Sequence, residues 1–272
     1  GLSRFRVNTY RQRGSLAAVI RVIAFELPDP GILNIPEDVM SVSDFTKGMV
    51  LVTGPAGSGK STTMACIVDR INHSREGHII TLEDPLEYLH RHDKCIVSQR
   101  EICTDTESYL VSLRATLRQS PDVILLGEMR DYETIQTAMT AAETGHLILS
   151  SLHTTGAANT IGRIVDVFEP AQQRQISIQL SMVLQAVISQ QLIPDINGHT
   201  IPAFEVMRLN PAIRNMIRDN KVHQIDGVIA SSAHEHMRSM DQSLLELYKQ
   251  NKITKETALK FASNADMLKR KL

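Results

Sequence analysis

The sequence predicts an α/β protein with a mainly parallel sheet, and two observations lead to that prediction. From residue 49 onward, short apolar runs typical of buried strands alternate with longer segments that have helical spacing. A glycine-rich loop lies between the first of these strands and the helix that follows it. Repeated strand–helix units form parallel sheets with helices on both faces. The 272 residues are enough for one large domain, alone or with part of a second.

The elements of the predicted sheet follow in chain order. Buried strands are expected at 49–53, 78–82, 123–126 and 146–152. Helices are expected at 60–72, at 107–119, from an N-terminal cap at Asp131 to about 143, and from about 157 and 171. An antiparallel hairpin is expected at 186–194 and 200–207, around Asn197-Gly198. Helical spacing then prevails from 211 to the end.

The first residues have a different pattern. Polar and apolar residues alternate over 2–8, and residues 16–25 continue in apolar, β-rich steps. The chain has no initial methionine, so we expect that upstream sequence is missing; a small N-terminal subdomain, complete as given, is the alternative. Breaker residues at 27–31 and 34–36 predict a linker at 28–44. The main domain is then expected at 45–272, with a helical C-terminal part from about 208.

The composition argues against several classes of protein. Hydrophobic residues make up 42% of the chain and charged residues 22%, as in an ordinary globular protein. A formal net charge of −1 offers nothing that would attract nucleic acid. Three cysteines are too few for a disulfide framework, and the longest apolar runs are too short to span a bilayer. We therefore expect no nucleic-acid partner and no direct membrane insertion.

The loop after the first strand carries the strongest chemical signal. It fits the pattern G-x-x-x-x-G-K-[ST] in full, with a strand before it and a helix after it. The glycines let successive backbone N–H groups face a phosphate, the lysine reaches the outer phosphates, and the Ser61 hydroxyl is placed for Mg²⁺. The predicted ATP-binding residues are Gly54, Pro55, Ala56, Gly57, Ser58, Gly59, Lys60, Ser61 and Thr62.

Two of the predicted strands end in acidic residues. Glu83 and Asp84 follow the strand at 78–82, and Glu128 follows the strand at 123–126. In an open parallel sheet, ligands bind at the carboxyl ends of the strands, so these acids should face the nucleotide. One acid should hold Mg²⁺ through water, and the other should orient or deprotonate the attacking water. For Asp84, a helix cap or another structural role is the better interpretation.

Histidines and arginines provide further candidates. His146 and His153 bracket one buried strand, and a polar residue at a strand end can sense the γ-phosphate, although each histidine alone is better explained as a satisfied structural residue. Arg100 and Arg114 lie between the two acidic strands, and arginines can supply transition-state charge in cis or from a neighbouring subunit. From spacing alone, each arginine is better explained as a surface or salt-bridge residue.

These motifs, in this order, resemble a known family. Four segments resemble the Walker A, Asp box, Walker B and His box of one group of motors: the glycine-rich loop, Thr81 to Glu87, Leu126 to Asp131, and Gly145 to Thr155. That group is the secretion ATPases of type II secretion and type IV pili, whose Walker B motif also ends in Gly-Glu. The resemblance covers essentially the whole chain. The cysteine-rich zinc element of the pilus-assembly and type II secretion branches is missing here, which counts against those branches.

One segment points to a particular branch. Residues 211–219 resemble the Ala-Ile-Arg-Asn-Leu-Ile-Arg-Glu motif of the PilT-type pilus retraction ATPases, with Met216 and Asp219 as mild changes. On a helix, Arg214 and Arg218 share one face beside an apolar stripe, which suits a subunit contact or a coupling element. Without the resemblance, an ordinary amphipathic surface helix would be the preferred interpretation.

The resemblance implies a homohexamer with ATP and Mg²⁺ between subunits of a RecA-like domain. It makes residues 1–27 the remnant of a PAS-like N-terminal domain whose arginines approach the nucleotide, so Arg4 and Arg6 become candidates. It also implies that Glu83 is the general base, that Glu128 is the carboxylate on the Mg²⁺ side, and that His153 senses the γ-phosphate.

The resemblance further implies the cellular setting. The expected partners are a PilC-like platform protein of the inner membrane and a PilU-like accessory ATPase. The expected location is cytoplasmic, peripheral at the inner face of the cytoplasmic membrane. Three alternatives to a retraction motor stay open: an assembly or secretion ATPase of the same family, a RecA-type nucleic-acid motor, and a nucleotide-binding regulator that does not hydrolyse ATP.

Overall fold

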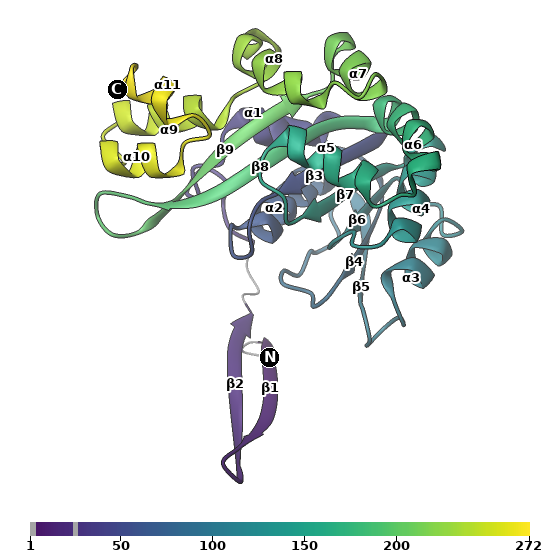
Figure 1. The fold of residues 1–272 in the computed structure, drawn as a ribbon. Helices are drawn as coiled ribbons and strands as arrows, with labels where there is room; N and C mark the ends of the chain where they lie inside the picture. The colour runs from purple at the N-terminus through teal and green to yellow at the C-terminus, as the bar shows by residue number, and fades with distance from the viewer. Residues whose placement is uncertain (1–3, 24–26) are drawn as a thin grey trace.

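A seven-stranded sheet forms the centre of the main domain in this computed structural model, which describes residues 4–23 and 27–272 (Figure 1). The strand order is β5 (Cys95–Glu101), β4 (Gly77–Glu83), β6 (Val123–Leu126), β7 (Leu147–Leu152), β3 (Gly48–Thr53), β8 (Leu184–Pro194) and β9 (Thr200–Arg208). Neighbouring strands are parallel except for β8 and β9, which are antiparallel. The predicted α/β fold with a mainly parallel sheet is confirmed.

The strands build a hydrophobic core on each face of the sheet, because successive side chains point to opposite faces. In β3, Met49 and Leu51 enter one core, whereas Val50 and Val52 enter the other. The first core is covered by α3 (Tyr109–Thr116), α4 (Tyr132–Glu143), α5 (Ala157–Asp166), α6 (Pro170–Val183), α7 (Pro211–Arg218) and α8 (Ile225–Ser231). The second core is covered by α2 (Lys60–Ser74), α1 (Glu37–Met40) and the 3₁₀ helix η1 (Ser41–Asp44).

A third, smaller core lies where the β8–β9 hairpin extends beyond the sheet. Ile193 and Ile201 of the hairpin pack there against α9 (Met240–Lys249), α10 (Lys255–Phe261) and α11 (Ala265–Lys269). Two further 3₁₀ turns, η2 (Val222–Gln224) and η3 (Ala233–Glu235), complete this helical C-terminal part. Over residues 4–23 and 27–272, no helix combines the length and hydropathy of a bilayer-spanning segment.

Two segments of the main body differ from the sequence-based expectations. The linker predicted at 28–44 folds in its second half into α1 and η1, where Val39 and Val42 are fully buried in the second core. Burial of these apolar side chains outweighs the nearby breaker residues. Strand β5 has no counterpart among the predicted strands, because only Cys95 and Val97 of its seven residues are buried, and an apolar residue, Ile96, is exposed.

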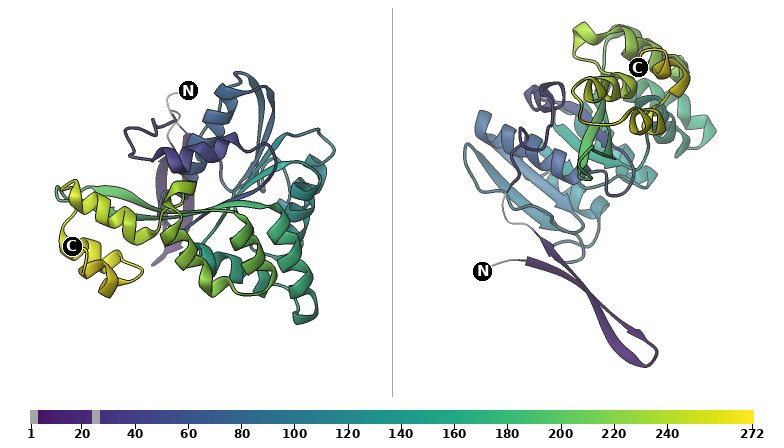
Figure 2. Two further views of the ribbon diagram at one scale, coloured as in Figure 1. Left: turned by 90° about the horizontal axis from the view of Figure 1, so that it is seen from above. Right: turned by 90° about the vertical axis from the view of Figure 1, so that its left-hand side faces the viewer.

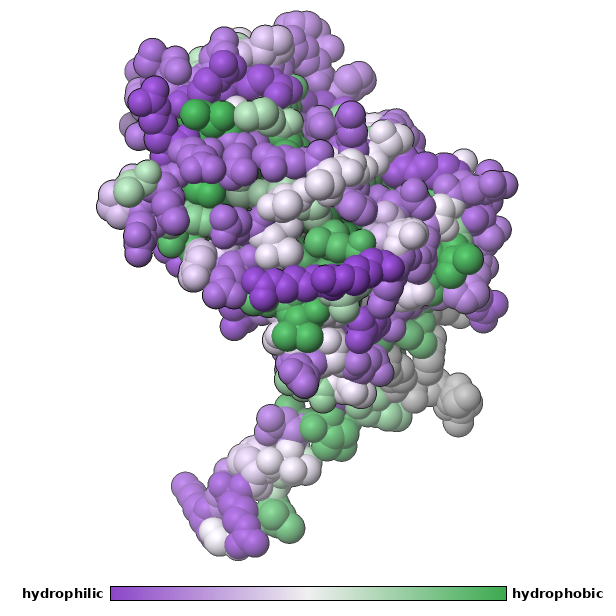
Figure 3. Space-filling model, turned by 90° about the vertical axis from the view of Figure 1, so that its right-hand side faces the viewer, coloured by the Kyte–Doolittle hydropathy of each residue, from purple (hydrophilic) through white to green (hydrophobic). Residues whose placement is uncertain are grey.

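The N-terminal residues form a separate antiparallel hairpin, β1 (Arg4–Gln12) and β2 (Ser15–Ile23), which extends away from the main domain (Figure 2). Large apolar side chains are exposed on it, and Figure 3 shows hydrophobic surface alternating with hydrophilic surface along its length. They are Phe5, Val7, Leu16, Val19, Ile20 and Val22. The assignment of residues 1–27 to a PAS-like domain stays a prediction, and residues 1–3 and 24–26 lie outside the described residues.

Candidate active site

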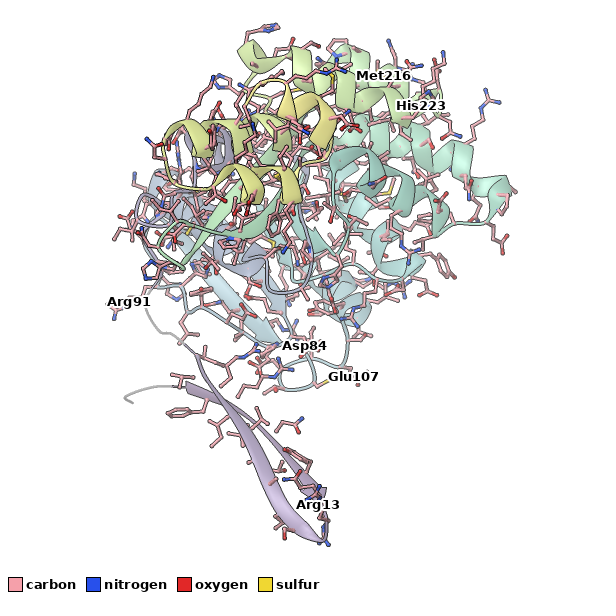
Figure 4. The ribbon with its side chains drawn as sticks, turned by 60° about the vertical axis from the view of Figure 1, so that its left-hand side comes forward. Arg13, Asp84, Arg91, Glu107, Met216 and His223 are labelled. Atoms are coloured by element: carbon pink, nitrogen blue, oxygen red, sulfur yellow. The ribbon has the colours of Figure 1, made fainter. Side chains whose placement is uncertain are left out.

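A cleft of about 450 Å³ lies where four parallel strands end. The glycine-rich loop follows β3, Glu83 ends β4, Glu128 follows β6 and His153 follows β7, and all four elements line the cleft. Figure 4 shows Asp84, another lining residue, at the edge of the domain nearest the hairpin, whereas Met216 of α7 lies at the opposite end. Since β7 lies between β3 and β6, His153 is placed between the loop and Glu128.

The glycine-rich loop joins β3 to α2 and turns its backbone toward the cleft. Gly54 has a φ of 145°, and a Cβ there would collide with the carbonyl oxygen of Gln190, so β8 packs directly behind the loop. Gly57 has a φ of 76°, and a Cβ there would meet no described atom within 4 Å. Ala56 and Gly57 line the cleft, whereas Ser58 is buried. The loop therefore presents unobstructed backbone to a phosphate-sized group.

Lys60 lies inside the loop instead of extending into solvent. Its Nζ donates hydrogen bonds to the carbonyl oxygens of Gly54, at 3.0 Å, and Pro55, at 2.9 Å. Burial lowers the pKa of this ammonium group. Lys60 and Ser61 both line the cleft, and their contacts with phosphate and Mg²⁺ stay predictions.

Glu83 has a partly buried carboxyl group with an unusually high pKa. It ends β4 and lines the cleft, and burial raises the pKa of its carboxyl group to about 7. A carboxylate with a pKa near the working pH accepts a proton from water more readily than an ordinary glutamate does. Asp84, which follows it, is exposed and also lines the cleft.

Glu128 is held between two basic side chains. Its Oε1 lies 2.7 Å from Nε of Arg130, and its Oε2 lies 3.5 Å from Nε2 of His153. On the neighbouring strand, the Ser151 hydroxyl donates to the carbonyl oxygen of Gly127 at 2.5 Å. The end of β7 is thus fixed against the end of β6, which places His153 beside the Glu128 carboxylate.

Arg100 and Arg114, two of the predicted catalytic residues, lie outside this cleft. Nη2 of Arg100 donates to the carbonyl oxygen of Asp105 at 3.1 Å, and Nη2 of Arg114 lies 3.8 Å from Oε2 of Glu133. These are the local contacts of surface arginines, so neither side chain reaches the cleft of its own chain. The reason is that α3 carries Arg114 on its outer face, and β5 is the edge strand of the sheet.

Some of the other basic residues line the cleft, and others do not. Arg6 of the hairpin and Arg130 both line the cleft. The side chain of Arg4 lies outside what the structure describes. Nδ1 of His146 lies 2.9 Å from the carbonyl oxygen of Ala141, so this histidine is the satisfied structural residue that spacing alone favours.

Several residues of the site carry no sequence motif. Tyr109 lines the cleft and packs against Gly127, where a Cβ would lie 2.8 Å from the tyrosine Oη. The Oη of Tyr88, also in the cleft wall, lies 2.9 Å from Oγ1 of the predicted nucleotide-binding residue Thr62. Behind the loop, Gln190 Oε1 accepts a hydrogen bond from Thr63 Oγ1 at 2.7 Å. Among the cleft residues that were not predicted, only Arg130 could have been identified from the sequence, because it follows Glu128 by two positions.

The parallel sheet, the glycine-rich loop and the two carboxylates around one cleft define a P-loop ATPase. Comparisons with known proteins give the family. The sequence profile described as Type II/IV secretion system protein matches residues 4–270, and the chain belongs to that family.

Several relatives are close. The chain is 46% identical to the type IV pilus retraction ATPase PilT of Pseudomonas aeruginosa over 258 residues, which are 95% of this chain and 75% of that one. It is 44% identical to a twitching motility protein of Neisseria gonorrhoeae over 268 residues, 98% of this chain and 72% of that one. A crystal structure of the pilus retraction motor PilT with bound ADP superposes with a TM-score of 0.93, with 48% identity, covering 99% of this chain and 77% of that one.

Proposed function

We propose that this protein is a hexameric motor ATPase that drives type IV pilus retraction, which disassembles pilin and produces twitching motility. The observation that carries the proposal is the convergence of Lys60, Glu83 and Glu128 on one cleft at the edge of the sheet. A nucleotide-binding regulator needs only the lysine, whereas hydrolysis also needs a base and a carboxylate near the metal. The assignment of retraction draws on the similarity to the PilT relatives.

The cleft fits ATP with Mg²⁺. The backbone at Gly57 is open on the cleft side and lies at the N-terminus of α2, where the helix dipole favours phosphate. The Ser61 hydroxyl and the Glu128 carboxylate would hold Mg²⁺, since this metal prefers oxygen ligands. When bound, the metal neutralises charge on the phosphate oxygens.

The side chains of the cleft divide the work of hydrolysis. Glu83 takes a proton from the attacking water, and its raised pKa suits that step. Lys60 exchanges the loop carbonyls that it now contacts for phosphate oxygens. His153, beside Glu128, is placed to respond to the outer phosphate.

Coupling to movement involves the N-terminal hairpin. Arg6 lines both the nucleotide cleft and a smaller cavity of about 190 Å³ between the hairpin and residues 85–88. An arginine at this junction is attracted by phosphate charge, so closure of the hairpin against the main domain should depend on the nucleotide state. In a ring of six subunits, sequential closure would displace each neighbour in turn. The work would be delivered to a PilC-like platform protein, with a PilU-like ATPase as accessory, from the cytoplasmic side of the inner membrane.

The pH dependence of hydrolysis tests the role of Glu83. Only the deprotonated carboxylate accepts a proton, so kcat/KM should rise with pH and level off above a midpoint near 7. The measurement is steady-state phosphate release between pH 5.5 and 8.5. The residual activity of Glu83→Gln, measured over the same range, shows how much of the pH dependence comes from titration of ATP itself. The part of the rise that comes from Glu83 should be absent in this variant. An unchanged rise in the variant would assign the titration to another group.

Deletion of the gene tests the proposed direction of work. A retraction motor removes pili, so its loss should abolish twitching motility and leave cells with excess pili, counted by electron microscopy. Restoring the parent gene should reverse both effects, whereas restoring the Lys60→Ala variant should reverse neither. Cells without pili would contradict retraction and favour an assembly ATPase of the same family.

A further inference from the structure

A buried carboxylate lies behind the nucleotide site, outside the cleft. Glu205 of β9 is only 7% exposed, and its Oε1 accepts a hydrogen bond from the backbone N–H of Ala157 at 2.9 Å. The backbone N–H of Met240 also interacts with this carboxyl group, and Val206, the next residue of β9, exchanges two backbone hydrogen bonds with Arg238, two residues before α9. Ala157 and Met240 are the first residues of α5 and α9. One carboxyl group therefore lies at the N-termini of two helices. Burial raises its pKa, and the free N–H groups at the two helix starts partly offset that effect.

The residue opposite Glu205 on the neighbouring strand contacts the same helix start. Ser189 of β8 pairs with Glu205 in the strand register, and its hydroxyl accepts a hydrogen bond from the Gly156 N–H at 2.9 Å. Gly156 has no side chain that could cap α5, so these two strand residues act in place of a cap. On its other side, Ser189 pairs with Thr53, the last residue of β3 before the glycine-rich loop.

The anchored helix start is continuous with the nucleotide site. His153, whose Nε2 lies 3.5 Å from Glu128 Oε2, is separated from Gly156 by two residues. A shift of His153 must therefore be absorbed within two residues or passed to the N-terminus of α5. At that point Glu205 faces α9, which also contacts β9 through Ser243, whose Oγ accepts from the Phe204 N–H at 3.1 Å.

We propose that Glu205 is a positioning residue that links the His153 segment to helix α9. The inference rests on the proposed ATPase function. Because the same carboxyl group interacts with the first N–H group of both helices, a change at the start of α5 alters its interaction with α9. Ser189 holds the same helix start to the P-loop strand. The link gives the C-terminal helices, which lie outside the nucleotide cleft, a direct mechanical connection to it.

The variant Glu205→Gln tests this role in the full chain. Glutamine has the same shape, but its NH₂ group cannot accept from an N–H, so the interaction with one of the two helix starts is lost. We expect kcat for ATP hydrolysis to fall by roughly 10- to 100-fold with a KM that changes by less than about threefold, since misplacement of the His153 segment impairs the reaction more than binding. The variant Ser189→Ala should lower kcat in the same way, which keeps the test open if Glu205→Gln does not fold.

The matched control is Ser243→Ala. It removes a buried contact between β9 and α9 that does not involve α5, so it should lower the melting temperature and leave kcat unchanged. A general loss of packing would instead lower kcat in Ser243→Ala and Glu205→Gln alike, and that result would overturn the inference.

A second measurement does not depend on turnover. Hydrogen–deuterium exchange of the parent should show that ADP changes the protection of residues 153–160 and also of residues 240–244. In Glu205→Gln, ADP should still protect the first segment and should no longer affect the second. A response at 240–244 that persists in the variant would overturn the inference. A parent protein that binds ADP but does not hydrolyse ATP would contradict the proposed function. The inference could still be tested in that case, because the exchange response to ADP does not require hydrolysis.

Discussion

Replacing Glu83 by glutamine is expected to lower kcat for ATP hydrolysis by about 10²- to 10⁴-fold, the usual contribution of a general base. Glutamine keeps the size of the side chain and removes the group that accepts the proton of the attacking water. Since Glu83 ends β4 away from the phosphate-binding backbone of the loop, ATP affinity should stay within about threefold of the parent value. Steady-state phosphate release and titration with a fluorescent nucleotide measure the two quantities.

The matched control for this experiment is Glu76→Gln. Glu76 is exposed and precedes the same strand at its opposite end, so it differs from Glu83 in position and not in chemistry. Its replacement should leave kcat and ATP affinity unchanged. If Glu83→Gln retained the parent kcat, Glu83 would not be the base, and Glu128 would be the next carboxylate to test.

Replacing Lys60 by alanine is expected to remove most nucleotide binding together with hydrolysis. The ammonium group supplies positive charge at the outer phosphates, and loss of one such donor typically costs about 10²- to 10³-fold in kcat. The affinity for ATP should fall as well, because Lys60 contacts the substrate and not only the transition state. Equilibrium titration with ATP and ADP and phosphate release at saturating ATP measure the two losses.

Lys47→Ala is the matched control for the lysine. Lys47 is exposed and lies just before β3, whereas Lys60 lies beyond its other end, so both flank the same strand. The control should bind and hydrolyse ATP like the parent. Lys60→Ala also removes two hydrogen bonds to the loop, so thermal unfolding should be recorded for both variants. A Lys60→Ala protein that is folded and hydrolyses ATP normally would contradict the site.

Much of the fold could be predicted because its signals are local. The buried strands at 49–53 and 123–126 are continuous apolar runs, and each is found in the sheet as β3 or β6. The cap predicted at Asp131 is confirmed, since its side chain accepts from the Thr134 N–H at 2.8 Å. Edge strand β5 could not be predicted in this way, because its stability comes from hydrogen bonds to β4 and only part of its side chains are buried.

The same contrast holds within the site. Lys60, Glu83, Glu128 and His153 each follow a recognisable strand, so the chemistry of the loop and the strand ends was predictable. Arg100 was predicted to be catalytic, but it lies on edge strand β5, outside the cleft of its own chain. The sequence contains no signal for which side of such a strand faces the nucleotide. The order of the strands, which places β7 between β3 and β6, likewise arises only when the chain is folded.

By itself, the sequence determined that this protein is a nucleotide-binding ATPase with carboxylates at the ends of two of its strands. A phosphate-binding loop consists of consecutive residues, so its chemistry can be recognised from the sequence alone. Only the tertiary structure decided that Tyr88 and Tyr109 line the cleft and that Glu205 lies between the starts of α5 and α9. Glu205 lies 48 residues from Ala157 along the chain, and such contacts depend on strand order and burial, which no local spacing encodes.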